Sequence, residues 1–149
     1  MEKLERIIFV ARSGSCREPM AVGILNDLTL KMDVEILARG LVVSFPEPMN
    51  GKAEAVLISN GITLENFTSQ QLKNEEITEN TLVFTMERTQ REKVLSHYPN
   101  ANVENVHVLT DYVGDELEIL DPYGGSLQSY GLCYETLRKS IKKLVKILN

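Results

Sequence analysis

A short segment near the start of the chain combines small residues with arginine. It follows the apolar run at residues 6–11 and precedes helix-compatible sequence that begins near Pro19. A junction of strand, loop and helix points several backbone N–H groups and the positive end of a helix into one concavity, which favours phosphate or sulfate. Arg17 can add a bidentate guanidinium contact to such an anion. The candidate donors are Arg12, Ser13, Gly14, Ser15, Cys16 and Arg17.

The elements that must position this loop follow from the hydrophobic pattern. Apolar, β-branched runs predict strands over residues 6–11, 34–39, 81–86 and 105–110, and the stretches 19–30, 52–59 and 87–97 are compatible with helices. A final helix is clearest, because its apolar residues step by three and four. They are Leu127, Tyr130, Tyr134, Leu137, Ile141, Leu144 and Leu148. Alternating strands and helices predict an α/β domain with a parallel sheet, whose ligands bind beyond the carboxyl ends of the strands.

Length and composition limit the class of protein. The 149 residues, 43% hydrophobic and 25% charged, predict a single domain over residues 1–149. A net charge of -5 argues against a nucleic-acid partner. The apolar run at residues 7–10 is too brief for a signal peptide or a membrane span, so we expect a cytoplasmic protein without a membrane partner.

Cysteine and histidine content bears on redox state and metals. Two cysteines, Cys16 and Cys133, are too few for a disulfide scaffold and fit a reducing compartment. His97 and His107 have no metal-ligand spacing, so we expect neither a metal nor a cofactor.

The loop and later segments resemble the low-molecular-weight protein tyrosine phosphatase family. The family motif C-x-G-N-x-C-R-S-P matches Cys16, Arg17 and Pro19 in register, and its first cysteine falls at Ala11. Further likenesses lie at residues 60–62 (Asn-Gly-Ile), 68–72 (Thr-Ser-Gln-Gln-Leu), 82–86 (Leu-Val-Phe-Thr-Met) and 121–126 (Asp-Pro-Tyr-Gly-Gly-Ser). The resemblance therefore covers almost the whole chain. It implies a three-layer αβα fold with a four-stranded parallel sheet in the order 2-1-3-4 and helices on both faces.

The resemblance also implies roles for individual residues. In the family, the cysteine attacks phosphorus as a thiolate, while loop amides and an arginine stabilise the phosphoryl oxygens and an aspartic acid protonates the leaving group. Arg17 and Asp121 would fill the supporting roles, and Phe45 and Tyr123 resemble the walls around a phosphotyrosyl ring. The methyl group of Ala11 cannot attack phosphorus. Loss of a covalent nucleophile costs some enzymes about a million-fold in turnover.

Three departures around the loop accompany Ala11. Ser13 replaces a family glycine, Gly14 an asparagine and Glu18 a serine. Several changes together favour natural divergence and a catalytically impaired protein that binds phosphate or a phosphorylated ligand, including a phosphotyrosine protein. The alternatives are an active phosphatase represented by a Cys-to-Ala form, and a protein-interaction module whose loop binds nothing. We expect a monomer or weak homodimer.

Other groups near the loop offer weaker hypotheses. Cys16 directly precedes Arg17, which is the wrong spacing for a substitute nucleophile, and Ser13 and Ser15 have no adjacent base. Glu18 stands at a helix start, where negative charge is favoured. Its carboxylate could itself occupy the anion-binding position of the loop. From sequence, however, we prefer the interpretation that Glu18 is a solvated glutamate at the helix start.

Overall fold

Four parallel strands form the centre of the molecule. The computed structural model describes residues 3–149. In chain order the strands are β1 (Arg6–Ala11), β2 (Glu35–Gly40), β3 (Thr81–Thr85) and β4 (Val106–Val108). They pair in the order β2-β1-β3-β4, which confirms the predicted topology.

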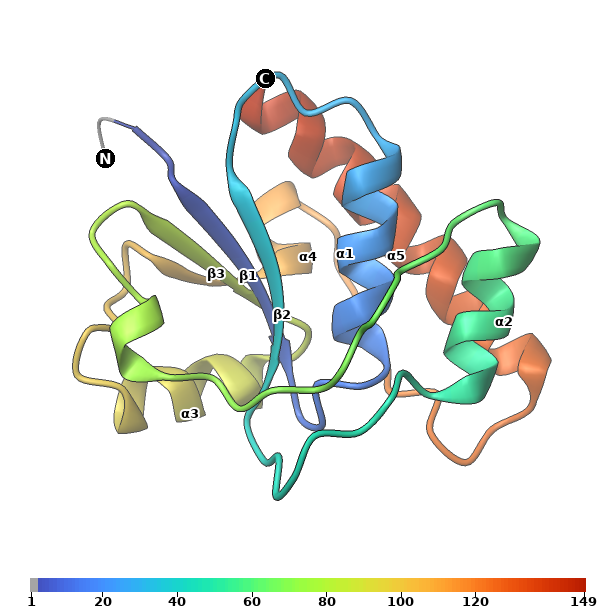
Figure 1. Ribbon diagram of the computed structural model, residues 1–149. Coiled ribbons are helices and arrows are strands. Elements are labelled where there is room, and N and C mark those ends of the chain that lie inside the picture. The colour runs from blue at the N-terminus through green and yellow to red at the C-terminus, as the bar shows by residue number, and fades with distance from the viewer. Residues whose placement is uncertain (1–2) are drawn as a thin grey trace.

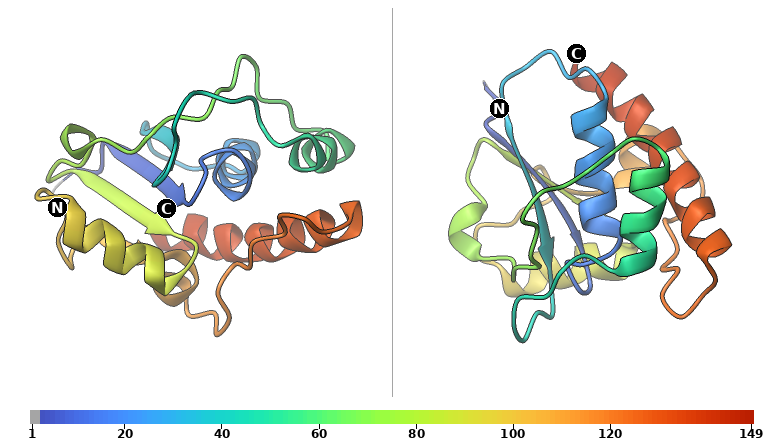
Figure 2. Two further views of the ribbon diagram at one scale, coloured as in Figure 1. Left: turned by 90° about the horizontal axis from the view of Figure 1, so that it is seen from below. Right: turned by 45° about the vertical axis from the view of Figure 1, so that its right-hand side comes forward.

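Helices cover both faces of this sheet, so the fold has three layers (Figures 1 and 2). The helices are α1 (Arg17–Asp27), α2 (Gly51–Ser59), α3 (Arg88–His97), α4 (Leu109–Val113) and α5 (Leu127–Leu148), with a short 3-10 helix η1 (Asn74–Glu76). Helix α5 packs against α1, α2 and α4 on one side, and α3 packs against β3 and β4 on the other. None of the helices among residues 3–149 is long and apolar enough to cross a membrane.

Strand β1 is central and buried from both sides. Ile7, Phe9 and Ala11 belong to the core between the sheet and the layer of α1 and α5, whereas Ile8 and Val10 belong to the core under α3. A parallel strand covered on both faces reads as a continuous apolar run. This burial fixes the carboxyl end of β1, where the candidate loop begins.

Element boundaries differ from the sequence prediction at several ends. The fourth strand is shorter than the predicted 105–110, because α4 begins immediately at Leu109. This helix ends at Val113, and Gly114 after it has a φ of +82°. The first helix begins at Arg17 rather than at Pro19, with the Cys16 carbonyl accepting from the Met20 amide. A proline fits within this first helical turn because its missing N–H has no partner there.

The amphipathic pattern of the last helix is confirmed along most of its length. Its buried residues are Tyr130, Cys133, Tyr134, Leu137, Ser140, Ile141 and Leu144. The Ser126 hydroxyl caps the helix by accepting from the Ser129 amide. Leu127 departs from the pattern, because 53% of it is exposed.

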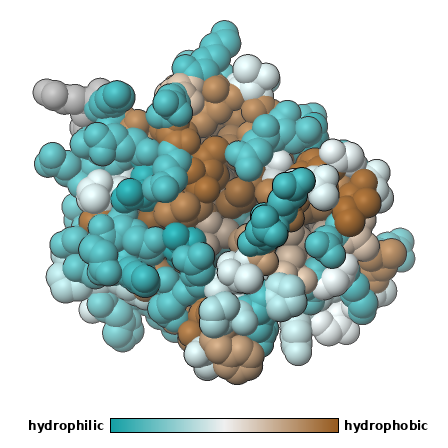
Figure 3. Space-filling view, viewed as in Figure 1, coloured by the Kyte–Doolittle hydropathy of each residue, from teal (hydrophilic) through white to brown (hydrophobic). Residues whose placement is uncertain are grey.

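Figure 3 shows a surface area over β2 and α1 where apolar residues gather, surrounded by hydrophilic side chains.

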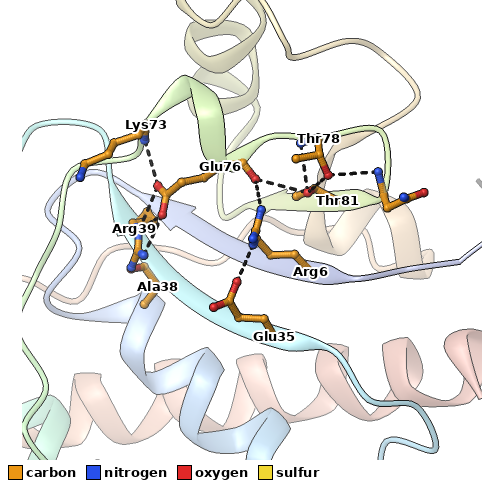
Figure 4. Close-up of polar contacts among 9 residues, drawn as sticks. Arg6, Glu35, Ala38, Arg39, Lys73, Glu76, Thr78 and Thr81 are labelled. Carbon is orange, nitrogen blue, oxygen red and sulfur yellow. Dashed lines mark hydrogen bonds and ion pairs between the residues drawn. The ribbon is translucent and has the colours of Figure 1, made fainter.

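Two ion pairs join the edge strand β2 to η1 and to β1 (Figure 4). Arg39 Nε donates to Glu76 Oε2 at 2.8 Å, and Arg39 Nη2 lies 2.8 Å from the same oxygen. Arg6 donates to the Glu76 carbonyl at 2.8 Å and to the Glu35 carboxylate at 2.6 Å. We call Arg6, Glu35, Arg39 and Glu76 the sheet-edge network.

Candidate functional site

The loop after β1 is held in place by backbone contacts on two sides. The carbonyl oxygens of Ala11 and Arg12 accept from the segment after β2, and the Ser15 carbonyl accepts from the Asn50 amide at 2.8 Å. Gly14 has a φ of +76°, which glycine adopts without strain. A Cβ on neighbouring Gly40 would lie 2.6 Å from the Gly14 nitrogen. Both glycines therefore permit the close approach of loop and strand end.

The loop lines a pocket of about 380 Å³. Residues from three separate segments surround it. From β1, the loop and the start of α1 come Ala11, Arg12, Ser13, Ser15, Cys16, Arg17 and Glu18; the others are Glu47, Pro48, Asn50, Asp121 and Tyr123. The structure thus brings most of the sequence-derived candidates to one place. Gly14 is not among the lining residues.

Arg17 is buried and held rigidly. Only 2% of the residue is exposed, and its Nη1 donates to Glu87 Oε2 and to the Ile119 carbonyl, each at 2.6 Å. Its Nη2 lies 3.8 Å from Asp121 Oδ2. The guanidinium is therefore oriented from the start of α3 and from the segment before α5.

Glu18 is not the solvated residue that we preferred from sequence. It is 1% exposed, and its Oε2 accepts from the Gly14 amide at 2.5 Å. Burial raises its pKa to about 6, while the amides of Glu18, Gly14 and Cys16 and the charge of Arg17 act in the opposite direction. The carboxylate turns inward because it accepts from a buried N–H of the loop that would otherwise lack a hydrogen-bond partner.

Neither thiol in the chain is activated. Cys16 and Cys133 are both free and buried. Burial is the main cause that raises the pKa of each to about 12, and for Cys16 the neighbouring Cys133, Glu18 and Asp121 add to it. Because the thiolate is the nucleophilic form, both cysteines are poor nucleophiles near neutral pH.

The remaining candidates divide between the pocket and the surface. Ala11 is 1% exposed and brings only a methyl group to the pocket. Asp121 is partly exposed, and its Oδ1 accepts from the Tyr123 amide at 3.0 Å. Tyr123 lines the pocket but is 80% exposed, whereas Phe45 is 66% exposed and does not line it. The pocket therefore lacks one of the two aromatic walls expected from sequence.

Sequence reasoning missed several residues of the site. Glu47, Pro48 and Asn50 line the pocket, and Glu87 binds Arg17. Asn50 also caps α2 by accepting from the amides of Lys52 and Ala53, which is a recognisable helix-start signal. No local signal links Glu87 to Arg17, because the two are 70 residues apart.

A larger groove adjoins the pocket. It has a volume of about 740 Å³ and lies between residues 116–125 and α5, sharing Asp121 and Tyr123 with the pocket. Leu117 and Leu120 line it and are 78% and 77% exposed. Among residues 3–149, no group of three or more His, Cys, Asp or Glu side chains is placed to hold a metal ion.

Comparison with known proteins identifies the family. Residues 6–149 match the family model described as low molecular weight phosphotyrosine protein phosphatase. A protein-arginine-phosphatase of Geobacillus stearothermophilus is 30% identical over 96% of this chain and 95% of its own length. The low molecular weight protein-tyrosine-phosphatase PtpB of Staphylococcus haemolyticus is 28% identical over 93% of this chain and 96% of its own. The solved structure of a low molecular weight protein tyrosine phosphatase from T. tengcongensis has a TM-score of 0.90 at 30% identity, covering 97% of this chain and 99% of that one. The chain therefore belongs to the low molecular weight phosphotyrosine protein phosphatase family.

Proposed function

We propose that this protein binds a phosphoryl group at the loop of residues 12–17 and does not transfer it to a cysteine. One observation carries the proposal. Ala11, which by resemblance stands at the position of the family nucleophile, contributes only a methyl group to the pocket. Neither Cys16 nor Cys133 can substitute, because both thiols stay protonated near neutral pH.

Groups that would support binding are nevertheless present. Arg17 and Asp121 both line the pocket. By resemblance, they correspond to the residues that the family uses for phosphoryl binding and proton donation. Backbone donors and an arginine do not depend on a thiol for their affinity. Loss of the thiolate also removes a negative charge that would repel a phosphate dianion.

The ligand that fits best is a phosphorylated protein side chain. The two curated relatives are named for phosphotyrosine and phosphoarginine, so both remain candidates. The groove beside the pocket exposes Leu117 and Leu120, which gives a polypeptide apolar surface to contact next to its phosphorylated residue.

An active phosphatase is the second candidate. The retained Arg17 and Asp121 and the names of the relatives favour it. In that case a nucleophile other than a cysteine at residue 11 would have to attack phosphorus. The two candidates differ in whether the unmodified protein turns over substrate.

Hydrolysis assays separate them. We expect no turnover of p-nitrophenyl phosphate or a phosphoarginine peptide by the unmodified protein. Ala11→Cys alone should gain little, because the Glu18 carboxylate would oppose ionisation of the new thiol. The double variant Ala11→Cys with Glu18→Ser should gain at least about a thousand-fold over the unmodified protein. Ala11→Val, which has similar bulk and no thiol, is the matched control and should stay inactive.

Turnover by the unmodified protein at a rate comparable with the double variant would overturn the proposal. Binding is tested separately with inorganic phosphate at about pH 5.5, followed through the backbone amide resonances of the loop. We expect saturable shifts that weaken about tenfold or more in Arg17→Lys, because lysine cannot make a bidentate contact. No saturable shift in any variant would contradict binding at this loop.

A further inference from the structure

Glu18 is the feature of the pocket that the proposed function does not use. Its carboxylate accepts from the Gly14 amide at 2.5 Å, and the amides of Cys16 and Glu18 itself also stabilise its ionised form. These donors belong to the same loop that an external anion would approach. A carboxylate on backbone N–H groups at a helix start is the arrangement that an anionic ligand adopts there.

We propose that Glu18 is an internal ligand of the loop, so that an external anion binds in competition with its carboxylate and takes up one proton as it binds. This inference rests on the proposed function, since it presumes that the loop is an anion site. It makes Glu18 the residue that determines which anions the pocket accepts.

The charges around Glu18 support this competition. Arg17, beside it on α1, is already paired with Glu87 at 2.6 Å and lies 3.8 Å from Asp121. Glu47 from the segment before α2 also lines the pocket, and Arg12 is its other cation. With Glu18 ionised, carboxylates outnumber arginines around the pocket, which disfavours entry of a dianion.

The protonation state of Glu18 therefore controls the balance. The nearby Cys16 and Cys133 stay neutral, because the pKa of each thiol is raised to about 12. Burial raises the pKa of Glu18 to about 6, so a proton is taken up at modest cost near neutral pH. Protonation removes the competing charge and frees the Gly14 N–H to donate to another acceptor.

The direction of the pH dependence follows directly. Below its pKa Glu18 is already protonated, and the affinity for an anion of constant charge should be level. Above that pKa, each further pH unit should lower the affinity about tenfold, because Glu18 must take up one proton from solution for each anion that binds. Ligands that carry their own proton or a cationic group should be favoured over dianions.

Sulfate tests this inference, because its charge does not change across the pH range used. We would titrate the full-length protein with sulfate by calorimetry from about pH 5.5 to about pH 8, where a pKa of about 6 predicts an affinity loss of about 50-fold or more. At the upper end, calorimetry in buffers of different ionisation enthalpy should report uptake of about one proton per sulfate. Glu18→Gln and Glu18→Ser should bind sulfate with level affinity and without proton uptake.

Glu54→Gln is the matched control, because it removes an exposed carboxylate from the first turn of α2, outside the pocket. It should reproduce the pH dependence of the unmodified protein. A level affinity in the unmodified protein, equal to that of Glu18→Gln, would overturn the competition while leaving the anion site intact. Failure of the unmodified protein and of both Glu18 variants to bind sulfate at any pH would overturn the proposed function, and this inference with it.

Discussion

The sheet-edge network and the cluster around Arg17 contain the same types of charged side chain. They differ in the balance between positive and negative charge. In the network, two arginines face two carboxylates, and Arg39 and Glu76 form a close pair with 13% and 16% of their side chains exposed. In the cluster, the single buried guanidinium of Arg17 lies among Glu87, Asp121 and Glu18. The network is complete as it stands, whereas the cluster has an excess of negative charge.

This difference distinguishes a structural contact from a candidate functional one. An ion pair whose members are hydrogen-bonded to each other needs no further charged partner. The pair of Arg39 and Glu76 fixes the edge strand β2 against η1 (Figure 4). A buried carboxylate with a raised pKa beside an oriented guanidinium is typical of a functional site. Removing one charge at a time tests this comparison.

The largest loss of stability is expected at Arg17. Arg17→Gln should lower the free energy of unfolding by about 3 kcal/mol, because it removes a buried guanidinium from its pair with the partly exposed Glu87 and leaves three carboxylates without their cation. Urea unfolding at constant pH measures the change. Arg12→Gln in the same loop is the control and should have little effect, since Arg12 is exposed. Equal losses in the two variants would mean that the buried pair does not stabilise the fold.

A smaller, pH-dependent effect is expected at Glu18. Its pKa is raised from 4.5 to about 6, so between those values the native state binds more protons than the unfolded state. Stability should therefore fall as pH rises through this window, by about 2 kcal/mol in total, and stay level above it. Glu18→Gln should lack this loss. Urea unfolding at about pH 4.5 and about pH 7.5 gives the comparison, and a constant difference between the two proteins would contradict it.

The third effect belongs to the sheet-edge network. Arg39→Gln should lower the free energy of unfolding by about 1 to 2 kcal/mol, because the carboxylate of Glu76 loses its close donors. The Glu76 carboxylate still accepts from the Lys73 amide, which limits the loss. Sulfate binding by Glu18→Gln should not change when Arg39→Gln is added. A loss of that binding would mean that the network also supports the pocket.

The fold could be predicted from sequence because its signals are local. Each strand is a separate apolar run and the last helix has its own hydrophobic period, while the resemblance supplied the strand order that these patterns alone do not give. The boundary between β4 and α4 was missed because no glycine, proline or other turn residue separates Val106–Val108 from Leu109–Val113. Tertiary packing divides that stretch into strand and helix.

The candidate site could be predicted where it is continuous in sequence or where the resemblance supplied a residue. The loop after β1 was found because its residues are adjacent, and Asp121 was found by resemblance. The pairing of Arg17 with Glu87 and the position of Glu47 depend on folding of distant segments. Burial of Glu18 was missed because a glutamate in a first helical turn is ordinarily exposed. Phe45 was assigned to the pocket by resemblance, but it does not line the pocket in the structure.

The smallest effect is expected at the exposed end of the sheet-edge network. Arg6 and Glu35 are 2.6 Å apart, but 29% and 54% of their side chains are exposed, so water and salt screen the pair. Glu35→Gln should lower the free energy of unfolding by less than about 0.5 kcal/mol, and added salt should remove that difference. Arg6 should stay in place because it also donates to the Glu76 carbonyl at 2.8 Å. A salt-resistant loss above about 1 kcal/mol would show instead that Glu35 fixes Arg6 and that exposure is a poor guide to the strength of ion pairs on this sheet.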